Sequence, residues 1–318
     1  MLSIDLNSSS HGRNGPVNMR NYAARTTLFL ALLTLGLALF GISVIDLVKH
    51  DTDYYSHIPV LYLVFGVILF WERKKIFINT CYSPVFGSLA VIAGIAVFVF
   101  SRMNQAAFSP NNYFSALSLS MLIFTAGIFF LCFGPAAFKK AAFPIFLLVL
   151  AIPLPDFMLT RFTYILRIYS TSSTVWILEM FGIYPIRDGF FLTLPEVTLE
   201  VAEQCSGIRS SIALLIISVL YGRYYLKTLT GRVLLVGMAL VALPLKNGLR
   251  ISALTILSIH WDKKVLSGPM HTSGGMLFFG VALVWVMAVL FFLAGMERIA
   301  LKKIKPAPIS SEEERLSS

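Results

Sequence analysis

Residues 273–296 read SGGMLFFGVALVWVMAVLFFLAGM, a run without a charged side chain. A helix of this length, at about 1.5 Å per residue, crosses the ~30 Å hydrocarbon layer of a membrane. Similar apolar runs recur along the 318 residues, which are 57% hydrophobic and only 13% charged, with a mean hydropathy of +0.78. This composition excludes a soluble enzyme with one core and excludes a disordered chain. We expect an all-α polytopic membrane protein.

About eight transmembrane helices fit the pattern of apolar runs. The expected spans are Thr26–Ile45, Ile58–Trp71, Pro84–Phe100, Tyr113–Phe133, a short and proline-rich Ala141–Pro153, Ser206–Tyr225, Val233–His260 and Ser273–Met296. The resulting organisation is a cytoplasmic tail (1–25), a membrane-embedded domain (26–297) and a second cytoplasmic tail (298–318).

The net charge of +10 follows the membrane topology and does not indicate nucleic-acid binding. With the N-terminus inside, 16 of the 26 Lys and Arg residues lie on the inner side, 7 lie on the outer side and 3 lie within spans. This bias predicts that both termini are cytoplasmic and that the protein sits in the cell (inner) membrane. The three cysteines imply no disulfide framework.

Two segments between the fifth and sixth expected spans differ from the rest. Residues 157–181 are apolar but contain Arg161, Arg167 and Glu179, and we interpret them as an outer-surface or re-entrant amphipathic helix. A full crossing stays open, although it would turn the basic group Arg223–Arg232 outward. Residues 182–204 combine glycines and prolines with β-favouring runs, and they predict a small extracytoplasmic loop of strand character.

The first candidate site residue, Cys205, stands where the sixth expected helix begins, in the stretch Glu203-Gln-Cys-Ser-Gly-Ile-Arg209. The positive end of a helix and the Arg209 guanidinium four residues on both favour a thiolate. The common alternative is that a lone cysteine at a helix start is only a small apolar residue. Ser206 adjoins the thiol as a supporting polar group.

Two further groups are expected at the same outer interface. Arg250 lies 18 residues beyond Arg232, about 27 Å along a helix, and Asn247 shares its face. Arg250 either extends to the interface or pairs with a negative group. His271 precedes the glycines that open the last span, and His260 is a competing histidine. A thiolate, a proton donor and a cation together suit attack on a carbonyl.

These motifs resemble the exosortase/archaeosortase family. The resemblance rests on Cys205-Ser-Gly-Ile-Arg209, on Asn247-Gly-Leu-Arg250, and on His271 before a glycine-containing span. The segments Asp53–His57, Trp71–Arg73 and Pro144–Asp156 add to it, and the likeness covers roughly residues 45–290.

The resemblance implies an integral membrane thiol protease and transpeptidase that forms an acyl-thioester. Cys205 would be the nucleophile, with Arg250 and His271 as its catalytic partners and Arg209, Asn247, Ser206 and His57 in supporting roles. The implied partners are secreted proteins that end in a short motif such as Pro-Glu-Pro, a transmembrane helix and a basic tail. The implied process is protein sorting linked to exopolysaccharide production. An extended substrate could pair with loop 182–204 by strand addition.

No His/Cys/Asp spacing resembles a metal-ligand set, and we expect no cofactor. A multi-pass transporter or channel is the main alternative, since Lys246 and Arg250 could line an anion path. It predicts two related halves, and the sequence has no such repeat. A membrane enzyme acting on lipid or glycan is a second alternative, through His271 and the outer carboxylates Glu196, Glu200 and Glu203.

Overall fold

The structure is a computed structural model that describes residues 19–50, 55–77, 80–195, 197–202, 208–260 and 269–304. Within these ranges the side chains of 19–22, 40–50, 209, 269–274 and 301–304 are not described. The chain is mostly helical and forms two compact units, one ending at Leu154 and the other beginning at Pro155. The membrane-embedded region that we expected to be one domain therefore contains two packing units.

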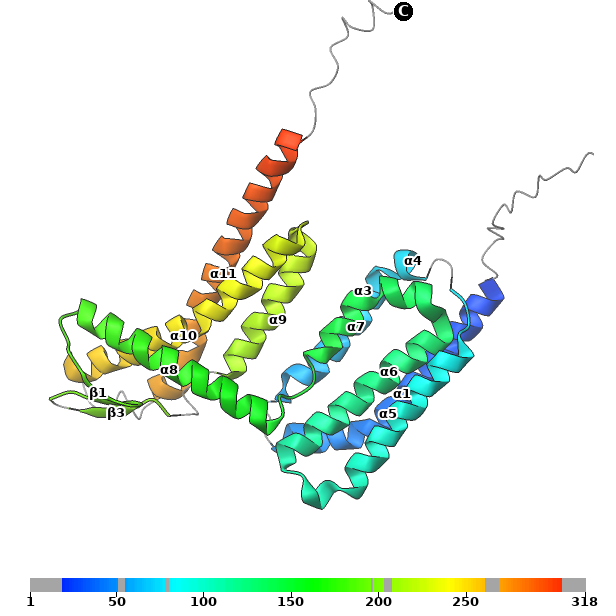
Figure 1. Cartoon of the computed structure of the whole chain (residues 1–318), viewed down its shortest axis with the longest axis horizontal. Coiled ribbons are helices and arrows are strands. Elements are labelled where there is room, and N and C mark those ends of the chain that lie inside the picture. Colours follow the sequence, from blue (N-terminus) through cyan, green and yellow to red (C-terminus); the bar gives the residue numbers. More distant parts are fainter. Residues whose placement is uncertain are drawn as a thin grey trace, which may run out of the picture. The chain divides into compact units, whose positions relative to one another are not determined.

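The first unit is built from helices (Figure 1), and its core is rich in phenylalanine. Its elements are α1 (Met19–His50), α3 (His57–Trp71), α4 (Arg73–Ile76), α5 (Pro84–Met103), η1 (Gln105–Ala107), α6 (Pro110–Lys140) and α7 (Ala142–Val149). In the core, the ring of Phe133 packs against Phe29 and Phe77 with centroids 5.4 and 4.6 Å apart. Helix α1 packs on α6, and α3 packs on α7.

Helices α5 and α6 approach so closely that only glycine fits at their contact. A Cβ on Gly87 would lie 2.4 Å from the Leu131 backbone, and one on Gly94 would lie 2.8 Å from the Phe124 nitrogen. Small residues allow such approach in membranes, where helix pairs are held by packing instead of by exclusion of water.

Helix α6 bends at Gly134 and Pro135, where Gly134 has a φ of +74°. Proline has no N–H, so the carbonyl four residues earlier, that of Leu131, loses its helical donor. The Ser83 N–H donates to that carbonyl at 3.1 Å instead. The bend therefore attaches the segment before α5 to α6.

Four helices among the described residues are long and apolar enough to cross a membrane: Pro84–Met103, Pro110–Lys140, Leu229–His260 and Gly275–Ala300. Shorter apolar helices span Ala23–Leu39, His57–Trp71 and Ser210–Tyr225. The chain is thus a membrane protein, but eight transmembrane helices are not confirmed.

The fifth expected span, Ala141–Pro153, is wrong as a transmembrane helix. Only the eight residues of α7 form a regular helix, about 12 Å long, and turns and extended backbone follow. Ser115 Oγ donates to the Pro153 carbonyl at 2.9 Å, and Asn111 Nδ2 donates to the Leu154 carbonyl at 2.7 Å. These side chains supply the donors that prolines and a broken helix leave missing.

The second unit places α10 at its centre, in contact with α8, α9 and α11. Its elements are α8 (Asp156–Met180), β1 (Ile186–Asp188), β2 (Phe191–Thr193), β3 (Thr198–Glu200), α9 (Ile208–Tyr225), α10 (Leu229–His260) and α11 (Pro269–Ile304). The strands lie at the end of the unit where α9 and α11 begin and α10 ends (Figure 1).

The three strands form one antiparallel sheet in the order β1-β2-β3. Leu192 of β2 is fully buried, whereas its neighbours Phe191 and Thr193 are exposed, as expected where only one face is covered. The small sheet confirms the strand character that the sequence predicted for residues 182–204.

In its middle, helix α8 buries a short polar stripe and exposes two aromatic side chains. Ser170, Thr171 and Thr174 are fully buried, while Tyr169 and Trp176 are about 60% exposed. A helix lying on an aqueous surface needs the opposite arrangement, whereas a helix in lipid buries small polar residues against a neighbour. The middle of α8 therefore packs against a neighbouring helix through its polar side chains, whereas Arg161 and Glu179 nearer its ends are exposed.

Candidate functional site

Cys205 and Ser206 lie outside the described residues, which stop at Ala202 and resume at Ile208. The structure therefore describes the two flanks of the cysteine segment and the helices around them. Each flank is held by a basic side chain from a different helix.

The flank after the cysteine is held by Lys246. The Lys246 ammonium donates a short hydrogen bond to Ser210 Oγ, near the start of α9. Lys246 is only 8% exposed, and its position is one turn before Arg250 on α10. This bond joins the beginning of α9 to the part of α10 that contains the predicted Asn247–Arg250 motif.

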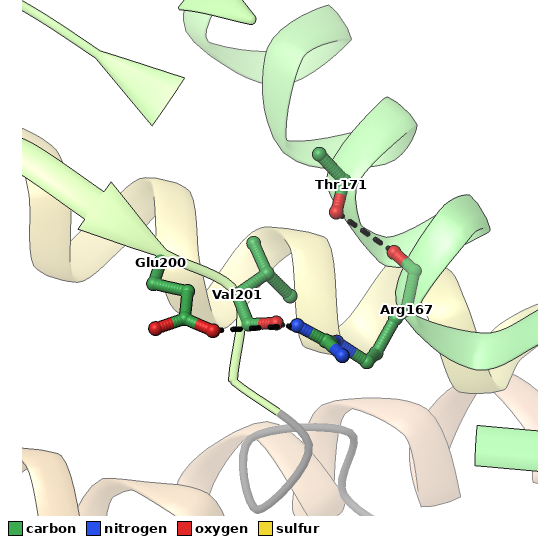
Figure 2. A network of polar contacts seen from close by, with 4 residues as sticks. All are labelled: Arg167, Thr171, Glu200 and Val201. Carbon is green, nitrogen blue, oxygen red and sulfur yellow. Dashed lines mark hydrogen bonds and ion pairs between the residues drawn. The ribbon is translucent and has the colours of Figure 1, made fainter. Parts of the chain in front are cut away.

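The flank before the cysteine is held by Arg167 of α8 (Figure 2). Arg167 Nε donates to the Val201 carbonyl at 2.8 Å, and Nη2 lies 3.5 Å from Glu200 Oε1. The guanidinium also stacks over the ring of Phe190, 3.9 Å from its centroid. Val201 is 1% exposed, and its N–H donates to the carbonyl of Phe190, between β1 and β2, at 3.0 Å.

Asn247 faces α8 and is almost completely buried. Its Nδ2 donates to Ser170 Oγ at 3.1 Å, and one turn further on Ser252 Oγ donates to the Thr174 carbonyl at 3.2 Å. Between them, a Cβ on Gly248 would lie 2.6 Å from Ser173 Cβ. Asn247 thus positions α10 on α8, and the partly buried Arg250 is three residues on.

Helices α10 and α11 run antiparallel. The Glu297 carboxylate accepts from the Lys227 and Thr228 N–H groups at 2.7 and 3.1 Å, at the start of α10. Further along, Ala242 and Lys246 line one groove of about 310 Å³ with Trp285 and Val281.

Continuing this register, Arg250 is 22 residues after Thr228, and the same count back from Glu297 reaches Gly275. His271 is four residues before Gly275, nearer the N-terminal end of α11, which corresponds to about 6 Å of helix rise. By this count, the His271 position lies toward the same end of the helix pair as Arg250.

Three predicted residues remain: Arg209, His57 and His260. Arg209 is the second residue of α9, without a described side chain, and His57 begins α3 in the first unit. His260 is exposed at the end of α10, with Nδ1 2.9 Å from the Ile256 carbonyl of its own helix. Among the described residues, no group of three or more His, Cys, Asp or Glu side chains could hold a metal ion.

Sequence reasoning missed the roles of Arg167, Ser170 and Lys246 as partners. Arg167 stood out only as a charge in an apolar stretch and Lys246 as a cation within a span, while Ser170 belongs to a Ser/Thr run in the same stretch as Arg167. Polarity in a membrane segment was the available signal, but the partners lie 34 to 77 residues away along the chain.

Comparison with known proteins gave one family. Residues 48–288 match the family described as transmembrane exosortase (Exosortase_EpsH). Neither the curated proteins nor the solved structures gave a match. Because the match covers most of the chain, from the last residues of α1 to within α11, this protein belongs to the transmembrane exosortase family.

Proposed function

We propose that this protein is a membrane thiol protease and transpeptidase that cleaves C-terminal sorting signals of secreted proteins. Family membership supports a membrane transpeptidase or protease role. The proposed substrates end in a motif such as Pro-Glu-Pro, followed by a transmembrane helix and a basic tail. Cleavage would occur on the extracytoplasmic side, with both termini of the enzyme in the cytoplasm.

The observation that supports this proposal best is the pair of bonds that flank residue 205. Val201 is bonded to Arg167, and Ser210 is bonded to Lys246, one turn from Arg250. Four and five residues separate Cys205 from these two bonded positions, so the covalent chain limits its distance from both. Counting along the antiparallel α10 and α11 puts the His271 position about 6 Å of helix rise beyond the level of Arg250, toward the same end of the helix pair.

In the proposed reaction, the Cys205 thiolate attacks the carbonyl carbon of the scissile peptide bond. The Arg250 guanidinium stabilises the oxyanion, and His271 gives a proton to the departing amine. Breaking the C–N bond releases the helix and tail of the substrate and leaves an acyl-thioester on Cys205. An amine or water then displaces the thiolate, which restores the enzyme.

The test is processing of a secreted reporter that ends in Pro-Glu-Pro, an apolar helix and a basic tail. Cys205→Ala and Cys205→Ser should abolish release of the C-terminal helix. Cys81→Ala is the matched control, because Cys81 is an exposed free thiol in the other unit. Processing at the parent rate by Cys205→Ala would rule out the thiol mechanism. A transporter would tolerate that change.

A further inference from the structure

We infer that Arg167 is a positioning residue for the nucleophile: it holds the Val201 carbonyl and thereby fixes where the Cys205 segment leaves the sheet. The inference rests on the proposed function and names a residue outside the Cys-Arg-His set. It follows from three contacts of one side chain, together with the face of α8 from which that side chain projects.

The three contacts use three different parts of the guanidinium. The Nε edge donates to Val201 and an Nη group meets the Glu200 carboxylate (Figure 2), while the flat face covers Phe190. A planar fork satisfies all three at once, whereas a lysine ammonium has neither the plane nor the paired donors. With 12% of its side chain exposed, Arg167 is largely shielded from water that would compete for these contacts.

Val201 is the point where this fixation matters for the cysteine. Its N–H donates to the Phe190 carbonyl at 3.0 Å, so it still belongs to the sheet connection, and its carbonyl accepts from Arg167. Both backbone polar groups of Val201, its N–H and its carbonyl, are therefore bonded, and residue 205 is four positions on. Releasing the carbonyl would free the end of the sheet from α8 on the side that leads to the thiol.

The same face of α8 also packs against α10, the helix that contains Arg250. Arg167, Ser170, Thr171 and Thr174 are spaced at three, four and seven residues, which places them on one side of the helix. Ser170 accepts from Asn247, and Thr171 Oγ1 donates back to the Arg167 carbonyl at 2.8 Å. One rigid face of α8 thus links the end of the sheet to the α10 turn that contains Arg250.

The chain offers a matched control in Arg187. It also joins the sheet to α8, since Nη1 donates to Ser172 Oγ at 3.0 Å, but it lies on β1, away from the strand end that leads to Cys205. General loosening of the sheet would affect Arg167 and Arg187 variants alike. Loss of positioning would affect Arg167 variants alone.

The experiment compares Arg167→Lys, Arg167→Gln and Arg187→Gln in the full-length protein in detergent micelles. Two quantities are measured: kcat and KM for the Pro-Glu-Pro reporter, and the rate of Cys205 alkylation by iodoacetamide, located by mass spectrometry. Misplacing a reacting group by about 1 Å costs on the order of 100-fold in rate. We expect kcat to fall about 10- to 100-fold in both Arg167 variants, with KM within about 2-fold of the parent.

We also expect the alkylation rate of Cys205 to change at least about 3-fold in Arg167→Lys and to stay at the parent value in Arg187→Gln. A parent-like kcat in Arg167→Lys, an equal loss in Arg187→Gln, or an unchanged alkylation rate in Arg167→Lys would each overturn the inference. Because alkylation needs no substrate, it judges Arg167 even if Cys205→Ala still processes the reporter and the proposed function fails.

Discussion

Replacing Gly248 with alanine should separate α8 from α10 and destabilise the second unit. The added Cβ would lie 2.6 Å from Ser173 Cβ and 3.0 Å from the Thr174 nitrogen. Carbon atoms normally pack at about 3.5–4.0 Å, so the helices would have to part by about 1 Å. The backbone of α8 is one of the obstacles, so a change of side-chain rotamer cannot relieve the contact.

The cost follows from what lies on either side of Gly248. The Asn247 and Ser252 hydrogen bonds to α8, at 3.1 and 3.2 Å, would lengthen beyond effective range. Such bonds between membrane helices contribute about 0.6 kcal/mol each, and overpacking costs about 1–3 kcal/mol. Alanine regains about 1 kcal/mol of helix propensity. The expected net loss is about 1–3 kcal/mol of unfolding free energy.

The assay is SDS-induced unfolding from mild detergent, followed by circular dichroism. Gly237 lies on the same helix with nothing within 4 Å of its position for a Cβ, so Gly237→Ala should be neutral or up to about 1 kcal/mol more stable. Equal stability of Gly248→Ala and Gly237→Ala would refute the close approach of α8 and α10. Reporter cleavage should fall in Gly248→Ala only, because Arg250 is half a turn away.

Three other predictions test separate parts of the molecule. Arg250→Lys keeps the charge but loses the planar fork, so reporter processing should drop about 10- to 100-fold; activity near that of the parent would contradict an oxyanion role. Asn111→Leu removes the donor to the Leu154 carbonyl, and SDS unfolding should report a loss of about 1–3 kcal/mol; an unchanged midpoint would show that this bond is dispensable. Gly134→Ala combines a φ of +74° with a Cβ 2.5 Å from Cys81 Sγ, and the same assay should report a loss of about 2–4 kcal/mol, against no loss for Gly66→Ala in open space.

The site shows the limits of spacing arguments. Asn247 and Arg250 were predicted to share a face because they are three residues apart, but that spacing does not reveal that Asn247 bonds Ser170. Likewise, Arg167 was recognisable as an unusual charge in an apolar stretch, while its bond to Val201 depends on a sheet that returns 34 residues later. Local periodicity indicates a face of a helix and does not identify the element that covers it.

The sequence by itself determined the membrane class, the family and the strand character of loop 182–204, because apolar run length, motif spacing and turn residues are local properties. Only the tertiary structure decided that Ala141–Pro153 is not a continuous helix and that the polar stripe of α8 faces inward. Both depend on partners that are distant in the chain. Asn111 and Ser115 donate hydrogen bonds to the Leu154 and Pro153 carbonyls, which lipid could not do. Helix α10 covers the buried hydroxyl groups of α8, which would otherwise face hydrocarbon.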